Sequence, residues 1–295
     1  MAEVEPGPCI AIVGLGLMGG SLALALRAAG DAVGPIIGVD RDPAVVQAAL
    51  ARGAIAEGYA GLGAFLAGAD IIVLAAPVRT IIDLVPVVGA LAHPGALVLD
   101  LGSAKGEVIR AMDQLPPDLH AVGGHPMCGK ETSGLAAADA QLYRDKLFIL
   151  TPTARSDKAG LARAAWLAQT VGARSEVMDA ARHDQLVAAV SHVPFLVAAN
   201  LVHTASGWAE HDPAVWRTAA SGFRDTTRLA ASDTTMMLDI LLTNRDCIRA
   251  CLQDYVHSLS ELATLVANGD AAVLAPWLAA AAESRRMWER GMNHG

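Results

Sequence analysis

Near its start the chain reads Ile10-Ala11-Ile12-Val13-Gly14-Leu15-Gly16-Leu17-Met18-Gly19, an apolar run followed by glycines in the spacing Gly-x-Gly-x-x-Gly. Gly14 suits a tight turn, Gly16 lets the backbone approach a pyrophosphate, and Gly19 lets the next helix lie close to the strand. Because a helix begins at this loop, its first N–H groups, including those near Leu17 and Met18, would face the phosphates. The stretch predicts a dinucleotide-binding loop.

The surroundings of this loop distinguish it from a chance helix start, since the glycine spacing alone is a weak signal. A second apolar run, Ile36-Ile37-Gly38-Val39, stops on Asp40 about 20 residues further on, which is the expected arrangement. The carboxylate of Asp40 can accept hydrogen bonds from both ribose hydroxyls and repels a 2′-phosphate. We therefore predict NAD rather than NADP, with Arg41 as a neighbouring cofactor contact that weakens the preference slightly.

Apolar strands alternate with helical patterns through the first part of the chain. Further strands are predicted at residues 71–75, 97–101, 121–123 and 147–150. This alternation is typical of an α/β fold with a Rossmann-type, doubly wound parallel sheet. Such sheets bind ligands at the carboxyl ends of their strands. Ala76 and Pro77, which follow the strand at 71–75, are therefore predicted cofactor contacts.

The pattern changes after Met178, where strands give way to long helices predicted at 186–205, 236–267 and 271–287. We predict two domains, a dinucleotide-binding domain at 1–178 and an all-helical substrate and dimerisation domain at 179–295. Alanine and leucine recur on more than one face of the first of these helices, which leaves apolar surface to cover. A homodimer through the helical domain is the resulting hypothesis.

Composition excludes several classes of protein. The 295 residues are 53% hydrophobic, enough for two cores, and the net charge of −8 without a Lys/Arg cluster argues against a nucleic-acid partner. The mean hydropathy is +0.39, but Arg, Asp or His interrupts each apolar stretch, so we expect no membrane span. Glu3 and Glu5 make the N-terminus unlike a secretory signal, which favours a cytoplasmic location.

The four cysteines do not indicate a metal centre. They lack the Cys-x-x-Cys spacing, and no nearby histidine completes a zinc set, so we predict no metal and read them as reduced and mostly buried.

Polar residues interrupt apolar sequence in three short segments, 100–106, 125–134 and 222–228. The first two follow predicted strands, so Ser103 and His125 should meet above the nicotinamide ring. A hydroxyl and an imidazole there suit oxidation of an alcohol, because the base takes the hydroxyl proton while hydride leaves the same carbon. Ser103 could instead cap a helix over 105–112, and His125 alone could be a histidine satisfied inside the fold.

Together these segments resemble the prephenate/arogenate dehydrogenase family. The motifs that carry the resemblance follow the glycine loop in the family's order and cover nearly the whole chain: Asp100-Leu101-Gly102-Ser103-Ala104-Lys105-Gly106, His125-Pro126-Met127-Cys128-Gly129, Ser191-His192-Val193-Pro194 and Gly222-Phe223-Arg224-Asp225-Thr226-Thr227-Arg228. The family oxidises the 4-hydroxyl of a cyclohexadienyl ring with NAD(P) and releases the ring carboxylate as carbon dioxide. The resemblance implies the same reaction here.

By motif position, the resemblance implies that His125 accepts the 4-hydroxyl proton and that Ser103 hydrogen-bonds both this hydroxyl and the histidine. It implies that Arg228 grips a substrate carboxylate, for which guanidinium geometry is suited. Further substrate contacts are expected from His192, which could equally be a core histidine, and from three polar residues: Ser232, one helical turn after Arg228, and Lys130 and Thr132, which could equally be solvated loop residues.

Two positions depart from the family pattern. Phe195 stands where many relatives have a second histidine, and Met237 lies where a tryptophan often follows Ser-Asp-Pro. Prephenate, arogenate and an amino-substituted analogue therefore all remain substrate candidates.

Two other readings compete with this one. A β-hydroxyacid or imine reductase on a similar frame would use a lysine from the helical domain, but no lysine occurs from Asp179 onward. A regulator that senses NAD without reacting is the alternative from another class, because a fold does not fix a function.

Overall fold

The computed structural model describes residues 7–130 and 132–292. By their contacts the residues form two compact units, 1–248 and 249–295. The first unit holds the sheet together with the helices that pack on it, and the second consists of helices. The predicted domain boundary after residue 178 divides the chain differently, and it stays a prediction.

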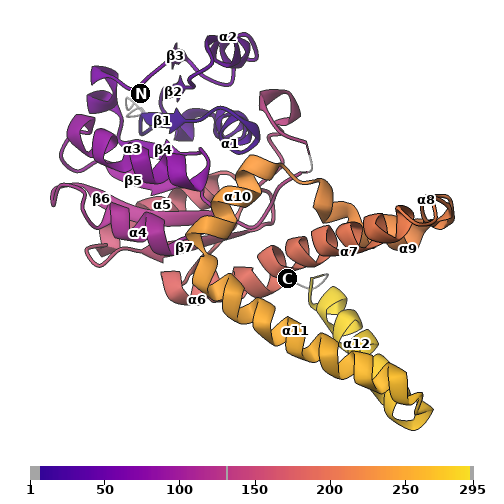
Figure 1. The fold of residues 1–295 in the computed structure, drawn as a ribbon. Coiled ribbons are helices and arrows are strands. Elements are labelled where there is room, and N and C mark those ends of the chain that lie inside the picture. Colours follow the sequence, from indigo (N-terminus) through magenta and orange to yellow (C-terminus); the bar gives the residue numbers. More distant parts are fainter. Residues whose placement is uncertain (1–6, 131, 293–295) are drawn as a thin grey trace. The chain divides into compact units, whose positions relative to one another are not determined.

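An eight-stranded sheet forms the centre of the first unit, with helices on both faces (Figure 1). Its strands are β1 Ile10–Val13, β2 Ile36–Val39, β3 Glu57–Tyr59, β4 Ile71–Leu74, β5 Leu97–Asp100, β6 His120–Pro126, β7 Leu147–Pro152 and β8 Arg174–Val177. Their order across the sheet is β3-β2-β1-β4-β5-β6-β7-β8. The strand order reverses at β1, beside the glycine loop, which confirms the predicted doubly wound architecture.

One part of the sheet differs from the predicted all-parallel arrangement. β7 runs antiparallel to β6, while β8 is parallel to β7. A parallel neighbour needs a long crossover, usually through an α-helix. Between β6 and β7 the described residues contain only a short 3-10 turn at Leu135–Ala137, so the chain returns in the opposite direction.

The helices of the first unit are α1 Leu17–Ala28, α2 Pro43–Ala51, α3 Val78–Leu91, α4 Gly106–Met112, α5 Lys158–Thr170, α6 Ala180–Val187, α7 Val193–Ala209, α8 Ala214–Thr218, α9 Ser221–Thr227 and α10 Thr234–Thr243. A π-helical turn, η4 Ala188–His192, joins α6 to α7, and a 3-10 turn, η5 Arg228–Ala231, follows α9. The helix α11 Arg245–Asn268 begins in this unit, and α12 Ala271–Met292 lies in the second.

Two apolar cores lie on opposite faces of the sheet because successive side chains of a strand alternate. Ile10 and Ile12 point to the face covered by α1, α2 and α5, whereas Ala11 and Val13 point to the face covered by α3 and α4. All four side chains are buried, as parallel strands covered on both faces require.

Two helix predictions need revision. The predicted helix at 236–267 is wrong as a single element, because it breaks at Asn244, which has a non-helical backbone (ψ 29°). The predicted helix at 186–205 is part of a longer one, Ala180–Ala209, which is long and apolar enough to cross a membrane by length and composition alone. Residues 187–209 of this helix contain no Asp, Glu, Lys or Arg, and one of their two histidines, His192, is 1% exposed.

Replacing Gly19 should destabilise the first unit. A Cβ atom at Gly19 would lie 1.9 Å from the carbonyl oxygen of Gly14 and 3.0 Å from Cβ of Ala75. We expect Gly19→Ala to lower the free energy of unfolding by about 1–3 kcal/mol, because α1 must move away from β1. Chemical denaturation measures this, with Gly61→Ala, where a Cβ meets open space, as the control. Equal stability of the two variants would contradict the close packing.

Candidate active site

The glycine loop has the geometry of an anion cradle. Gly14 has a φ of +97°, and a Cβ atom there would lie 2.4 Å from the carbonyl oxygen of Ala75, so a side chain is excluded. At Gly16 a Cβ atom would meet nothing within 4 Å, so the backbone faces open space. No side chain caps the N-terminus of α1. The first N–H groups of this helix, near Leu17 and Met18, are thus placed to bind a phosphate.

Asp40 lies beside this loop, as its position after β2 predicts. One carboxylate oxygen accepts the N–H of Leu15 at 2.9 Å, and the other accepts the N–H of Asp42 at 3.0 Å. Arg41 is exposed next to it, and Ala76 and Pro77 follow β4 on the other side of the loop. The N-terminus of α1 is uncapped, the turn at Gly14 excludes a side chain, and the acidic Asp40 follows β2. Together these features fit the pyrophosphate and ribose of NAD.

A buried ion pair joins the two segments that carry Ser103 and His125. Lys105 and Asp100 are both 0% exposed and contact each other, and the Lys105 ammonium also donates to the carbonyl of Gly124 at 2.9 Å. Asp100 in turn accepts the N–H groups of Gly102 at 2.7 Å and Gly124 at 3.0 Å. Burial lowers the pKa of Lys105, although Asp100 acts in the opposite direction. The pair fastens the β5–α4 loop to β6.

His125 is the penultimate residue of β6, and its ring is hydrogen-bonded to another histidine. Its Nδ1 atom lies 2.8 Å from Nε2 of His183 on α6, and Nδ1 of His183 lies 2.8 Å from Oδ1 of Asp184. His183 is fully buried, whereas His125 remains partly exposed. Burial and the neighbouring His183, Lys105 and His192 hold the pKa of His125 well below 6.5. The ring is therefore neutral at physiological pH.

The carboxylate of Asp184 caps α4. It accepts the N–H groups of Lys105 and Gly106, each at 2.8 Å. The alternative role of Ser103 as the cap of this helix is therefore wrong: the cap position is Lys105, and Ser103 makes no capping bond. Sequence reasoning missed His183 and Asp184, because they stand between Arg182 and Gln185 in the polar sequence of α6, where nothing singles them out.

His192 belongs to the same polar network. Its Nδ1 atom lies 3.2 Å from Nδ2 of Asn244, which also donates to the carbonyl of Asp184 at 2.8 Å. Since the amide donates, Nδ1 of His192 accepts and its proton resides on Nε2. Burial lowers the pKa of His192 to about 4. The side chain is a neutral hydrogen-bond donor in this setting.

The other predicted substrate residues lie on loops and short helices. Arg228 is exposed at the start of η5, which packs against α7. Ser232 donates to the carbonyl of Leu229 at 2.7 Å, and Lys130 pairs with Asp139 at 3.0 Å. Thr132 is exposed. The network of buried contacts described above does not include these four, and their substrate roles stay predictions.

Phe195 and Met237, the two positions that depart from the family pattern, are close in sequence to predicted substrate residues. Phe195 is partly exposed on α7, three residues after His192, and Met237 is buried at 6% exposure in α10. The preceding Asp233 caps α10 by accepting the N–H of Met236 at 2.8 Å.

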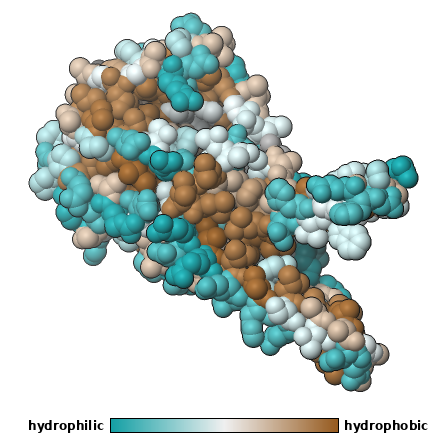
Figure 2. All heavy atoms as spheres, viewed as in Figure 1, coloured by the Kyte–Doolittle hydropathy of each residue, from teal (hydrophilic) through white to brown (hydrophobic). Residues whose placement is uncertain are grey.

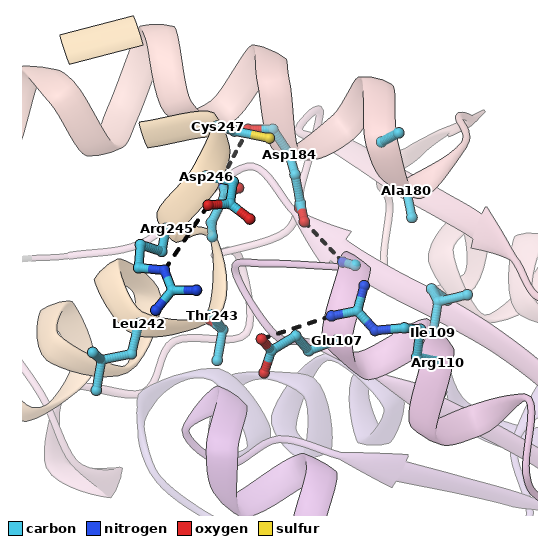
Figure 3. Close-up of a pocket in the computed structure, with 13 residues that line it drawn as sticks. Glu107, Ile109, Arg110, Ala180, Asp184, Leu242, Thr243, Arg245, Asp246 and Cys247 are labelled. Carbon is cyan, nitrogen blue, oxygen red and sulfur yellow. Dashed lines mark hydrogen bonds and ion pairs between the residues drawn. The ribbon is translucent and has the colours of Figure 1, made fainter. Parts of the chain in front are cut away.

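A separate pocket of about 410 Å³ lies between α4, α6 and the junction of α10 with α11 (Figure 3). Its guanidinium groups face neighbouring carboxylates, Arg110 with Glu107 at 3.7 Å and Arg245 with Asp246 at 3.9 Å. Asp184 is on its wall, whereas the predicted cofactor and catalytic residues are not among its lining residues.

The neutral state of His192 should make the protein sensitive to acid. Between pH 6.5 and 4 the unfolded chain binds a proton at this residue that the folded protein excludes, so the free energy of unfolding falls as the pH falls. We expect the free energy of unfolding to fall less between pH 6.5 and 4 in His192→Asn than in the wild type. The two losses should differ by on the order of 3 kcal/mol. Denaturant titrations of both proteins at the two pH values test this, and an equal loss in both would contradict it.

Comparison with known proteins identifies the family. Residues 22–177 match the nucleotide-binding domain of prephenate dehydrogenase, and residues 179–280 match its dimerization domain. The chain is 36% identical over 267 residues to prephenate dehydrogenase from Bacillus subtilis, covering 89% of this chain and 71% of the relative.

Two solved structures are similar over almost their whole length. The prephenate dehydrogenase of Aquifex aeolicus, in complex with hydroxyphenyl propionate and NAD+, has a TM-score of 0.88 at 32% identity, covering 97% of this chain and 99% of that one. The arogenate dehydrogenase of Synechocystis has a TM-score of 0.82 at 30% identity, covering 95% and 99%. With both family domains matched in order, the chain belongs to the prephenate dehydrogenase family.

Proposed function

We propose that the protein is an NAD-dependent dehydrogenase that oxidises and decarboxylates prephenate to 4-hydroxyphenylpyruvate, arogenate to tyrosine, or both, as a step of tyrosine biosynthesis. The observation that carries this proposal is the neutral, partly exposed His125 at the carboxyl end of β6, held by its Nδ1 atom. A base at this edge of the sheet stands where a doubly wound fold binds its ligands.

The proposed chemistry uses His125 as a temporary proton carrier. Its ring takes the proton of the 4-hydroxyl as the C4–H bond breaks, and Ser103 hydrogen-bonds the same hydroxyl. Bound NAD supplies the acceptor for the hydride. Loss of the ring carboxylate as carbon dioxide then pushes electrons onto the C4 oxygen, which regains the proton from His125. The ring becomes aromatic, and this drives the reaction forward.

The cofactor site in this proposal is the glycine loop and its surroundings. Backbone N–H groups at Gly14–Gly19 and the N-terminus of α1 bind the pyrophosphate, and Asp40 binds the ribose. Ala76, Pro77 and Ser103 line the nicotinamide side at the ends of β4 and β5, and Arg41 flanks the adenosine end. The uncapped N-terminus of α1 and the open space at Gly16 support this assignment.

Substrate carboxylates in this proposal are bound by Arg228, with His192, Ser232, Lys130 and Thr132 as further contacts. Packing of η5 against α7, the helix that follows His192, supports a shared site for Arg228 and His192. The neutral His192 donates a hydrogen bond rather than a charge. Phe195 replaces a donor with an apolar ring, so recognition of the substrate side chain depends on the remaining groups.

An assay of the purified protein tests the proposal. We expect NADH formation with prephenate or arogenate, and slower reduction of NADP because Asp40 repels a 2′-phosphate. The four combinations of substrate and cofactor also resolve the substrate. NAD binding without turnover on either substrate would instead favour the NAD-sensing regulator.

A variant and a pH profile identify the base within this assay. His125→Asn should lower kcat by on the order of 10² or more while NAD still binds, and His93→Gln, on the opposite edge of the sheet, should leave it unchanged. The wild-type kcat/KM should stay level down to pH 6.5 and fall only well below it, because the free base protonates there. Full activity of His125→Asn would remove it from this role.

We further propose a soluble, cytoplasmic homodimer formed through the helical domain at 179–295. Apolar side chains gather over α10 in Figure 2, where Met236, Leu238 and Leu242 are 43–51% exposed. On α11, Val256, Leu259 and Val266 share one helix face and are 48–62% exposed. Large exposed apolar patches mark interaction surfaces, and the match to a dimerization domain supports a second copy as the partner.

Charge on the apolar face of α11 should dissociate this dimer. We expect the double variant Leu259→Glu/Val266→Glu to sediment at the monomer mass and the wild type at the dimer mass, because burying two carboxylates in an apolar interface is unfavourable. Thr264→Glu, on the other side of the helix, serves as the control and should remain dimeric. A concentration-independent monomer mass for the wild type would refute the proposal.

A further inference from the structure

Behind His125 lie two buried ionisable residues whose contacts the proposed chemistry leaves unexplained. His183 is 0% exposed and Asp184 is 5% exposed. They are adjacent on α6, yet one contacts β6 and the other contacts the start of α4. Two segments of the proposed site, the end of β6 and the start of α4, therefore meet at one turn of α6.

The hydrogen bonds of Asp184 determine which way the protons point. Its carboxylate accepts two backbone N–H groups and the ring of His183. Although burial acts to raise it, these hydrogen bonds lower the pKa of Asp184, so the group is ionised and can only accept. Nδ1 of His183 must then carry the proton that it donates to Asp184.

The same reasoning applies to the ring of His125. With that proton on Nδ1, His183 presents the lone pair of Nε2, the atom 2.8 Å from Nδ1 of His125. His125 must then donate from Nδ1, which leaves its lone pair on Nε2. Neutral imidazole in water favours the opposite tautomer, with the proton on Nε2, so the pair selects the form in which Nε2 is a base.

We propose that His183 and Asp184 are positioning residues that fix the base-competent tautomer of His125 and hold the Ser103 loop next to it. Asp184 holds the Ser103 loop through its hydrogen bonds to Lys105 and Gly106, two and three residues after Ser103. When His125 takes a proton, its Nδ1–H remains bonded to His183, and the carboxylate behind His183 stabilises the added charge. The tautomer assignment stands by itself, whereas the kinetic role rests on the proposed function.

Nitrogen NMR of the full chain with 15N-labelled histidine tests the tautomer without substrate. The His125 signals are assigned by their loss in His125→Gln. We expect a protonated Nδ1 and an unprotonated Nε2 for His125 in the wild type at neutral pH. In His183→Leu, which removes the acceptor, the proton should move to Nε2, whereas His183→Gln, whose side-chain oxygen can accept, should keep it on Nδ1. A wild-type His125 protonated on Nε2 overturns the proposal.

Kinetics of the same variants test the catalytic consequence. We expect His183→Leu to lower kcat by on the order of 10- to 100-fold with an unchanged KM for NAD, because His183 does not touch the glycine loop. His183→Gln should recover most of this loss, and His93→Gln should match the wild type. NAD binding and thermal unfolding confirm that each variant is folded.

The outcomes separate this proposal from the proposed function. An inactive wild type with the expected NMR tautomer refutes the dehydrogenase reading and leaves the tautomer assignment intact. An active wild type in which His183→Leu retains full kcat, or in which His183→Gln keeps the tautomer but not the rate, overturns the positioning role.

Discussion

The carboxylate of Asp184 at the N-terminus of α4 is the interaction on which the candidate site depends. An α-helix leaves its first N–H groups without partners, and an anion there is favoured by the helix dipole. Asp184 accepts two of these groups from the start of α4, which lies 78 residues earlier in the chain. The contact therefore holds α6 against the start of α4 and, through the adjacent His183, orients the ring of His125.

A second acidic residue makes a comparable contact nearby. Asp239 on α10 accepts the N–H of Arg79 at 3.3 Å, in the first turn of α3. The helices that follow the sheet are thus attached to it by carboxylates at helix ends, both at the carboxyl edge. Each contact gives backbone donors at a helix N-terminus an acceptor, so the helices cannot slide along this edge without leaving polar groups unpaired. The edge at which we propose that ligands bind is also the edge that fixes the helices.

Sequence reasoning found the features that depend on neighbours in the chain. Alternating apolar runs predicted the strands and the glycine spacing predicted the loop, because both follow from local backbone geometry. The antiparallel β7 and the break at Asn244 were missed, since each depends on a distant partner: the amide of Asn244 bonds to His192 and to the carbonyl of Asp184. The role of His183 was missed for the same reason, because its partner His125 lies 58 residues earlier.

Charge at the site has to be supplied locally because the protein as a whole is anionic, with a net charge of −8. Within the buried network, the Lys105 charge is balanced by Asp100, and depressed pKa values keep the rings of His125 and His192 neutral. A dicarboxylate substrate would then find its cations outside this network, at exposed groups such as Arg228. Burial and the nearby Lys105 lower the pKa of the His125 ring, whereas the carboxylate of Asp184 behind His183 stabilises the added charge as the proton arrives.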